Sequence, residues 1–124
     1  MGLDQWFYKS KEGCFYGKVQ LYDGSFSEKE HYQLPSDREE FFYFRKHYPL
    51  NEWIGYNAAP EDCYDFNCVP IECTNEILIE LFNSVIKGEV TSEYEKHNQD
   101  ILSFIREAFE LQKDDYKIYY YAWW

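Results

Sequence analysis

Two aromatic segments at opposite ends of the chain place the strongest limit on its fold. Residues 3–9 (LDQWFYK) and 116–124 (YKIYYYAWW) consist largely of side chains that favour β-strands. If the second segment were frayed, the large apolar rings of Trp123 and Trp124 would lie in water. We therefore expect 116–124 to form a docked strand beside the N-terminal strands, which are predicted over 3–9 and 14–22.

Two long helices are expected before the final strand. Thr74 is a good N-cap for a helix over 75–87, and Gly88 is a natural stop after it. Ser92 and Glu95 have the spacing of a capping box for a second helix over roughly 93–112. Each helix has apolar residues at helical spacing: Ile77, Leu78, Leu81, Phe82 and Val85 in the first, and Tyr94, Ile101, Phe104, Ile105 and Ala108 in the second.

The middle of the chain has weaker signals. Residues 35–40 (PSDREE) contain a Ser–Glu capping pattern and are predicted to open a helical turn. Pro49 suits the first turn of a further helix that begins near it. Residues 58–70 are predicted to be a loop, and turns are expected at 11–13 and 23–24.

These elements fit a single α+β domain over residues 1–124. The 124-residue chain is 45% hydrophobic and 22% aromatic, which is enough apolar material for a real core and is unlike a disordered protein. We expect an antiparallel sheet of the N-terminal strands and the C-terminal strand, packed against the two long helices. No internal repeat or low-complexity tract divides the chain.

Negative charge is concentrated in the second half of the sequence. The net charge is −11; residues 1–57 hold seven Lys/Arg and nine Asp/Glu, whereas residues 58–124 hold five and fourteen. A small domain needs a net charge of only about 2–8 in magnitude for solubility. The excess favours a basic protein partner and argues against direct binding of nucleic acid, whose phosphates attract Lys and Arg.

The sequence shows no membrane signal. The N-terminus has no basic and apolar signal-peptide pattern, and no apolar run approaches the ~20 residues of a membrane span. We expect a soluble, cytoplasmic protein. Cys14, Cys63, Cys68 and Cys73 are then expected to be reduced structural thiols, although a zinc site or a disulfide stays open as an alternative. No metal and no cofactor is predicted.

Repeated carboxylates suggest a binding surface. Glu72, Glu76 and Glu80 recur every fourth residue and are predicted to share one helix face. Glu107, Glu110 and Asp114 recur on the second long helix. Carboxylates spaced roughly like duplex phosphates would fit a nucleic-acid-binding groove. The alternative is an ordinary solvated helix surface.

A second candidate site surrounds the one concentrated basic segment. Arg45, Lys46 and His47 lie among aromatic residues, which is a pattern that stacks nucleotides. A small-ligand pocket would be built from Arg45, Asn51, Trp53 and Tyr94. In the alternative interpretation, Arg45 pairs with carboxylates of the acidic half and only supports the fold. No catalytic triad order or phosphate-binding loop is present, so an enzymatic role is uncertain and disfavoured.

Several short motifs are spread over nearly the whole chain: Met1-Gly2-Leu3-Asp4, Tyr43-Phe44-Arg45-Lys46 with Leu50 and Trp53, Asn67-Cys68, Thr91-Ser92-Glu93-Tyr94, and Tyr119-Tyr120-Tyr121 with Trp124. Together they resemble a family of small, uncharacterised proteins encoded by tailed bacteriophages. The chain departs from the family pattern at four positions, where it has Phe44 for Trp, Tyr48 for Asn, Asn51 for His and Glu95 for Asp. The resemblance implies a phage origin and the host cytoplasm, and it implies no reaction.

Charge and resemblance together predict an inhibitor. We expect a phage-encoded acidic protein that binds a basic surface of a host nucleic-acid-binding defence protein, of the anti-CRISPR or anti-restriction type, by nucleic-acid mimicry. The alternatives are a nucleotide or small-ligand module, or a small enzyme, at the Arg45–Trp53 segment, and a self-associating structural protein. The sequence does not predict the identity or stoichiometry of the target.

Overall fold

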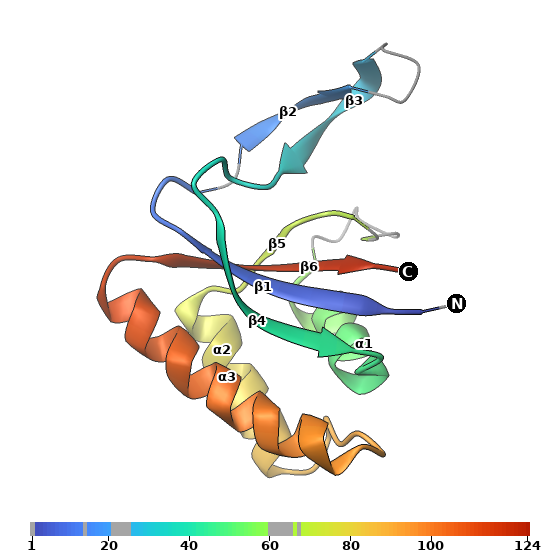
Figure 1. Cartoon of the computed structure of the whole chain (residues 1–124), viewed down its shortest axis with the longest axis vertical. Coiled ribbons are helices and arrows are strands. Elements are labelled where there is room, and N and C mark those ends of the chain that lie inside the picture. Colours follow the sequence, from blue (N-terminus) through green and yellow to red (C-terminus); the bar gives the residue numbers. More distant parts are fainter. Residues whose placement is uncertain (1, 14, 21–25, 60–65, 67) are drawn as a thin grey trace.

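The computed structural model describes the backbone of residues 2–13, 15–20, 26–59, 66 and 68–124, and the side chains of these residues except 15–20 and 26–33. Within this part of the chain, the order of elements is β1 (Asp4–Ser10), β2 (Phe15–Gln20), β3 (Phe26–Gln33), β4 (Glu39–Arg45), α1 (Tyr48–Asn57), β5 (Ile71–Glu72), α2 (Asn75–Ile86), α3 (Glu95–Lys113) and β6 (Lys117–Trp123) (Figure 1). The expected α+β fold is confirmed. None of the described helices is both long and apolar enough to cross a membrane.

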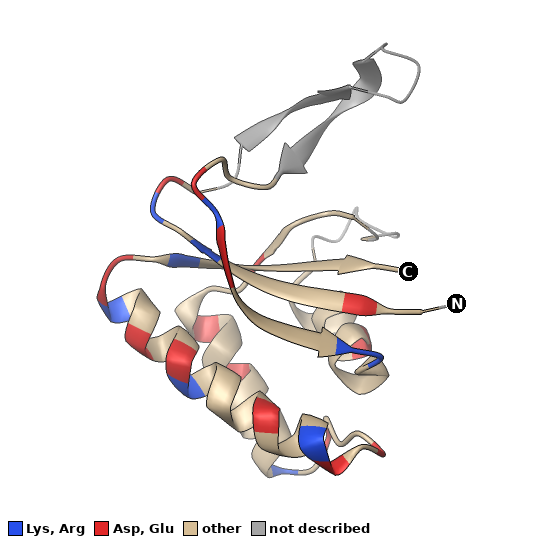
Figure 2. Ribbon diagram, viewed as in Figure 1, with Lys and Arg blue, Asp and Glu red and all other residues tan. Residues whose placement is uncertain are grey.

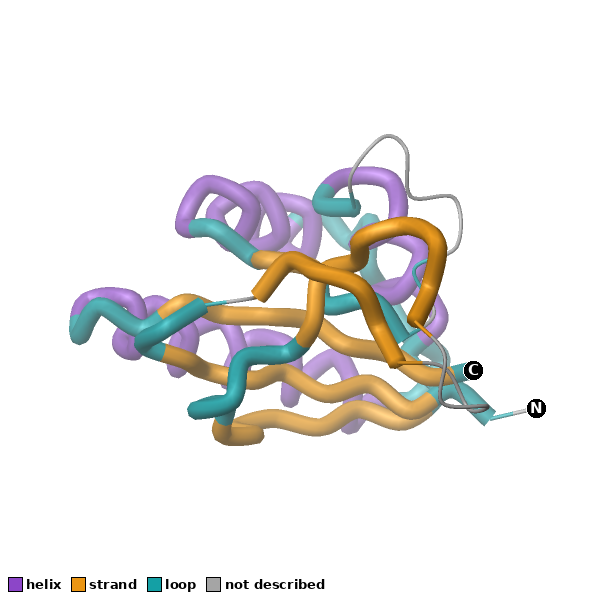
Figure 3. Tube along the Cα trace, turned by 90° about the horizontal axis from the view of Figure 1, so that it is seen from above, coloured by secondary structure: helices purple, strands orange, loops and turns teal. Residues whose placement is uncertain are grey.

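The main sheet has four antiparallel strands in the order β4-β1-β6-β5. The N-terminal strand β1 is therefore internal and pairs with the C-terminal strand β6 along its whole length, as predicted. Among the described strands, β2 and β3 pair only with each other, as a separate hairpin, so the expectation that the strand over 14–22 joins the sheet with the C-terminal strand is wrong. The helices lie on one side of the main sheet and the hairpin rises on the other (Figure 1); Figure 3 shows the hairpin in front of the strands and helical segments behind them.

The core lies between the sheet and the helices. Alternate residues of β1 and β6 point inward, so that Phe7 and Tyr120 are fully buried and pair across the two strands. The ring of Phe7 lies 3.8 Å, centroid to centroid, from that of Phe104 on α3. Ile101, Phe104, Ile105 and Ala108 are buried, as the helical spacing predicts.

Helix boundaries follow the local sequence closely at α2. The Thr74 hydroxyl accepts a hydrogen bond from the backbone N–H of Ile77, which confirms the predicted N-cap. Gly88, just past the end of the helix, has φ = 80°, a left-handed conformation that residues other than glycine rarely adopt. α1 begins one residue before Pro49, as expected for a proline in the first turn.

The predictions for two other segments are also wrong. Residues 35–40 do not open a helix: a short turn leads into β4, which begins at Glu39, because pairing with β1 satisfies the backbone of this segment. The capping box of α3 is also absent, since Tyr94 is the N-cap and makes no capping bond with its side chain. Tyr94 is half exposed rather than part of the core stripe. The predicted turn at 23–24 and most of the loop 58–70 lie outside the described residues.

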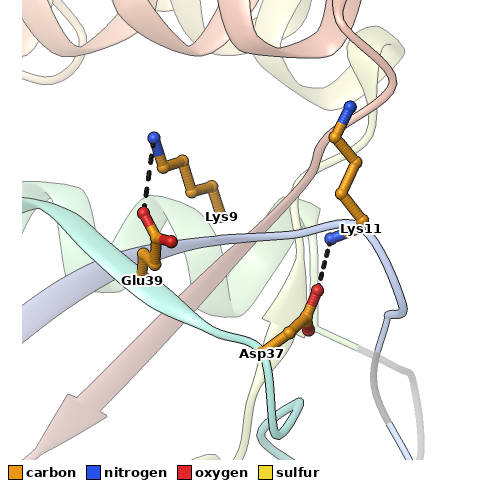
Figure 4. A network of polar contacts seen from close by, with 4 residues as sticks. All are labelled: Lys9, Lys11, Asp37 and Glu39. Atoms are coloured by element: carbon orange, nitrogen blue, oxygen red, sulfur yellow. Dashed lines mark hydrogen bonds and ion pairs between the residues drawn. The ribbon is translucent and has the colours of Figure 1, made fainter.

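Polar contacts join the end of β1 to the segment before β4 (Figure 4). The Lys9 ammonium lies 3.7 Å from the Glu39 carboxylate, and the backbone N–H groups of Lys11 and Glu12 donate to Asp37 at 2.9 and 3.2 Å. The Ser10 hydroxyl also donates to Asp37, and this bond, with the two backbone bonds, lowers the pKa of the carboxyl group. Asp37 therefore holds the turn at which the chain leaves the sheet for the hairpin.

Candidate functional site

The six predicted acidic residues do not lie on one surface. Glu72 is in strand β5 and not on a helix, so the prediction that it shares a helix face with Glu76 and Glu80 is wrong. The predicted N-cap at Thr74 already places Glu72 before the start of the helix, and this signal should have overruled the four-residue spacing. The Tyr119 hydroxyl donates to the Glu72 carboxylate at 3.4 Å. Tyr119 alternates with the inward-facing Tyr120, which places this pair on the side of the sheet away from the helices.

The other five acidic residues lie on or next to the helix pair. Glu76 and Glu80 are exposed on α2, Glu107 and Glu110 are exposed on α3, and Asp114 is the C-cap of α3 (Figure 2). We call these five residues the acidic helix surface. At about 100° per residue, Glu110 points away from the buried stripe of α3, with Arg106 and Glu107 on either side of it.

Few of these carboxylates are neutralised by internal cations. Among the described residues, the ion pairs are Lys9 with Glu39 and Lys113 with Glu110, the latter at 3.0 Å on the surface of α3. The pair between Lys113 and Glu110 is exposed on both sides, so it adds little stability. Most of the acidic helix surface is therefore available to a positive partner.

Helix α2 also exposes large apolar side chains beside these acids. Ile79, Phe82 and Ile86 are 45%, 41% and 63% exposed, and their spacing places them along one side of the helix. Gln112 donates to the backbone carbonyl of Cys73 at 3.0 Å, so the end of α3 lies beside the start of α2. The two helices are antiparallel. Leu102, which is exposed and lies about three turns before Gln112 on α3, is therefore near the exposed apolar residues of α2.

The opposite side of the main sheet is aromatic. We call the side that faces away from α1, α2 and α3 the outer sheet face. Its side chains follow from the strand register and form four rows: Arg45, Asp4 and Trp123; Tyr43, Trp6 and Tyr121; Glu40, Tyr8, Tyr119 and Glu72; and Ser10 and Lys117. The ring centroid of Trp6 lies 5.9 Å from that of Tyr43 and 6.2 Å from that of Tyr121. Single-sequence patterns missed this face because β4 was not recognised as a strand.

The residues of the predicted ligand pocket are not brought together. Trp53 donates its indole N–H to the Ser84 hydroxyl at 3.1 Å and packs between α1 and α2. Asn51 accepts a hydrogen bond from Tyr120 at 2.6 Å. Arg45 is exposed at the end of β4, and Tyr94 packs against His97. Trp53 and Asn51 thus make hydrogen bonds that stabilise the fold.

A buried polar network joins the N-terminus of α1 to the sheet. The side chain of Gln5 accepts from the backbone N–H of His47 at 2.8 Å and donates to its carbonyl at 3.0 Å. Gln5 also donates to the Tyr120 hydroxyl at 3.0 Å, which in turn donates to Asn51. Gln5, His47 and Tyr120 have no exposed surface. This network explains why polar side chains occupy the core, and it gives them a structural role.

A serine–histidine pair lies at the start of α3. The Ser92 hydroxyl is 2.8 Å from Nδ1 of His97, and it also accepts from the backbone N–H of Tyr94. Asn98 bonds both the N–H and the carbonyl of Ser92. Ser92 is buried and its hydroxyl is used to close the turn before α3, so the pair replaces the predicted capping box and is not arranged for nucleophilic attack.

An open groove of about 650 Å³ lies where the start of α2, the end of α3 and the start of β6 meet. Its lining includes Glu72, Lys113, Tyr116 and Lys117, which carry both signs of charge, and none of the residues of the predicted ligand pocket. Of the cysteines, Cys68 is exposed and Cys73 is buried; Cys14 and Cys63 lie outside the described residues. No group of three potential metal ligands occurs within the described part of the chain.

Comparison of the chain with protein-family models, with curated proteins and with solved structures finds no match. The resemblance to phage-encoded proteins, and the function inferred from it, thus stay predictions.

Proposed function

We propose that the protein binds a positively charged surface of a partner protein through the outward sides of α2 and α3. The observation that carries the proposal is the combination on α2 of the carboxylates Glu76 and Glu80 with the exposed apolar side chains of Ile79, Phe82 and Ile86. Large apolar groups are seldom left exposed at helical spacing unless another molecule covers them. Buried apolar anchors supply most of the affinity of such interfaces.

The carboxylates add speed and selectivity to this contact. The chain carries a net charge of −11, and few carboxylates of the acidic helix surface have an internal cation beside them. Complementary charge accelerates association and disfavours partners of the same sign. The contact should therefore weaken with added salt, because exposed charges are screened within about 10 Å at 0.1 M salt.

The partner class follows from the chemistry of the surface and from the resemblance to phage proteins. A host nucleic-acid-binding defence protein, such as a CRISPR effector or a restriction enzyme, has a basic groove for its substrate. A protein that presents carboxylates to that groove would compete with the nucleic acid. On this proposal the chain is an inhibitor that acts in the host cytoplasm and catalyses no reaction.

Inhibition of DNA cleavage tests the proposal. The protein is added to a panel of purified restriction enzymes and CRISPR effectors, and cleavage is measured at two salt concentrations. A variant with Glu76→Gln, Glu80→Gln and Glu107→Gln should inhibit less, because it removes three exposed charges from the acidic helix surface. The matched control has Glu52→Gln, Glu89→Gln and Glu93→Gln, which change the net charge equally at other exposed positions.

Phe82→Ala tests the apolar part of the same surface. The side chain is 41% exposed, so its removal should weaken inhibition while the protein stays folded. Equal inhibition by the wild type, the helix variant and the control would contradict the proposed surface. Absence of inhibition across the panel would contradict the proposed partner class.

A further inference from the structure

The outer sheet face is suited to hold cations between aromatic rings. Trp6, Tyr8, Tyr43 and Tyr121 form one contiguous block, in which Tyr43 and Tyr121 flank Trp6 and the rings of Tyr8 and Tyr121 lie 6.4 Å apart. Tyr43 is 44% exposed, and Trp123, at the corner of the face, is 59% exposed. Aromatic faces carry negative electrostatic potential and attract ammonium and guanidinium groups within about 6 Å.

One such contact already exists inside the molecule. The guanidinium carbon of Arg38 lies 5.9 Å from the ring centroid of Tyr8. Arg38 also donates to the backbone carbonyl of Pro35, so the chain itself supplies this cation from the turn before β4. The contact shows that a guanidinium group fits over this part of the sheet.

Carboxylates lie at the edges of the aromatic block. Asp4, Glu40 and Glu72 occupy positions in the rows above and below Trp6. Asp4 accepts a hydrogen bond from the Tyr43 hydroxyl, which, together with burial, raises the pKa of Tyr43 and keeps it a neutral ring. Against these three acids the same face presents Arg45, Arg38 and Lys117. The charges of the face therefore balance, in a molecule whose net charge is strongly negative.

We propose that the outer sheet face binds arginine or lysine side chains of an extended, basic segment of the partner protein. Alternate residues of an extended chain lie about 6.7 Å apart, which is also the separation of the rows along β1, so alternate side chains of the segment would meet successive rows. This inference extends the proposed function, on which its choice of a basic occupant rests. It assigns a second contact, because the acidic helix surface lies on the other side of the sheet.

The charge distribution disfavours the two other occupants of an aromatic sheet face. A single strand of nucleic acid would need a positive groove along its phosphates, whereas the acids and bases of this face balance and the whole molecule carries a net charge of −11. A second copy of the chain would bring together two molecules of net charge −11. A basic segment meets both the rings and the carboxylates with favourable interactions.

Binding of short peptides tests the inference directly. The probe is a fluorescently labelled peptide of alternating arginine and serine, compared with the same peptide containing glutamate in place of arginine. We expect saturable binding of the arginine peptide in about 50 mM salt, quenching of tryptophan fluorescence, and no binding of the glutamate peptide. Tyr43→Leu should weaken binding about three- to tenfold, whereas Tyr56→Leu, at an 82% exposed position on α1, should leave it unchanged.

Arg38→Ala separates a basic occupant from nucleic acid. Removal of the internal cation frees the Tyr8 ring, so the arginine peptide should bind at least as tightly as to the wild type and up to a fewfold more tightly. If an oligothymidylate bound instead, and Arg38→Ala or Arg45→Ala weakened it, the face would be a nucleic-acid site and the inference would be wrong. Dimerisation that Tyr43→Leu abolishes, measured by sedimentation equilibrium, would overturn it in favour of a second copy.

The same peptides keep this inference distinct from the proposed function. When Tyr43→Leu is added to the triple variant at Glu76, Glu80 and Glu107, it should still weaken peptide binding, because these carboxylates lie on the helices. Loss of nuclease inhibition in that variant, with no change of peptide binding on Tyr43→Leu, would support the helix surface and overturn the sheet-face site. Urea unfolding of each variant checks that the fold is intact.

Discussion

His47 and His97 stack their imidazole rings in parallel, with 4.7 Å between the ring centroids and 4° between the ring planes. His47 is fully buried and its Nδ1 accepts from the backbone N–H of Leu50, so it serves as the N-cap of α1. His97 belongs to α3, and the stack therefore joins two helices. Protonation of His47 would place a positive charge in a buried site against the neighbouring ring.

This stack predicts loss of stability in mild acid. Burial, and to a smaller extent the adjacent His97, lowers the pKa of His47 from its ordinary value of 6.5 to about 4. The unfolded chain binds the proton more readily than the folded chain, so the free energy of unfolding should fall as pH drops from 6.5 towards 4. The full loss from His47 is about 3 kcal/mol. Urea unfolding measured at pH values across this window checks it.

His47→Gln is the matched control for the acid effect. The variant is less stable at neutral pH, because the cap of α1 is altered, but its stability should change less with pH between 6.5 and 4. Protonation of carboxylates is common to both proteins and cancels in the comparison. Parallel pH profiles for the two proteins would show that His47 is not the group responsible.

The buried network around Tyr120 predicts a large loss of stability when the hydroxyl oxygen of this residue is removed. Tyr120→Phe removes the hydroxyl that accepts from the buried Gln5 and donates to the partly buried Asn51. The cost should be about 1–3 kcal/mol, because Asn51 loses its donor and Gln5 one of its two acceptors. Tyr43→Phe removes a hydroxyl bonded to Asp4 on the exposed outer sheet face and should cost clearly less. Chemical denaturation of both variants measures the difference, and equal costs would contradict this account.

The aromatic core predicts a severe effect of truncation at Phe7. Its ring is fully buried and packs against those of Phe44, Phe104 and Tyr120. Phe7→Ala should cost about 3–5 kcal/mol, since the cavity cannot be refilled by rings held on three separate elements. The half-exposed Phe82 on α2 provides the comparison, with an expected cost below about 1 kcal/mol for Phe82→Ala. Thermal and urea unfolding of the two variants test the contrast.

The two described cysteines should differ in reactivity. Cys73 is 1% exposed, and burial, together with the charge of Glu72, raises the pKa of its thiol to about 12. Because only the thiolate reacts, iodoacetamide should modify Cys73 far more slowly than the exposed Cys68 in the folded protein. Peptide mass spectrometry after brief labelling measures each site. Denaturation should abolish the difference, and similar rates in the native protein would show that Cys73 is accessible.

Local sequence signals predicted the elements whose boundaries depend on local chemistry. The Thr74 cap and the apolar spacing locate α2 and most of α3, and Pro49 marks the start of α1. The pairing of β6 with β1 was also predicted, from the cost of exposing terminal tryptophans. β4 was missed because a proline and a serine–glutamate pattern before it indicate a helix, and only long-range pairing with β1 makes the segment extended.

The residues that share a candidate surface also depend on long-range pairing, which local sequence patterns do not show. The spacing of Glu76 and Glu80 correctly places both on one exposed helix, because both fall inside α2. Glu72 continues the same spacing but lies in β5, where the period of the side chains is two instead of 3.6. The rows of the outer sheet face combine residues from four strands, and only the order of those strands reveals them. The stack of His47 on His97 was likewise invisible in the sequence.

The internal position of β1 has a consequence for biosynthesis. This strand is translated before both of its neighbours, β4 and β6, and β6 follows the three helices of the described part of the chain. Until then, Phe7 and Trp6 have no completed sheet to cover them, and their exposure invites association with other nascent chains or with chaperones. The distant pairing of β1 with β6 also makes closure of the sheet a slow, late event in maturation.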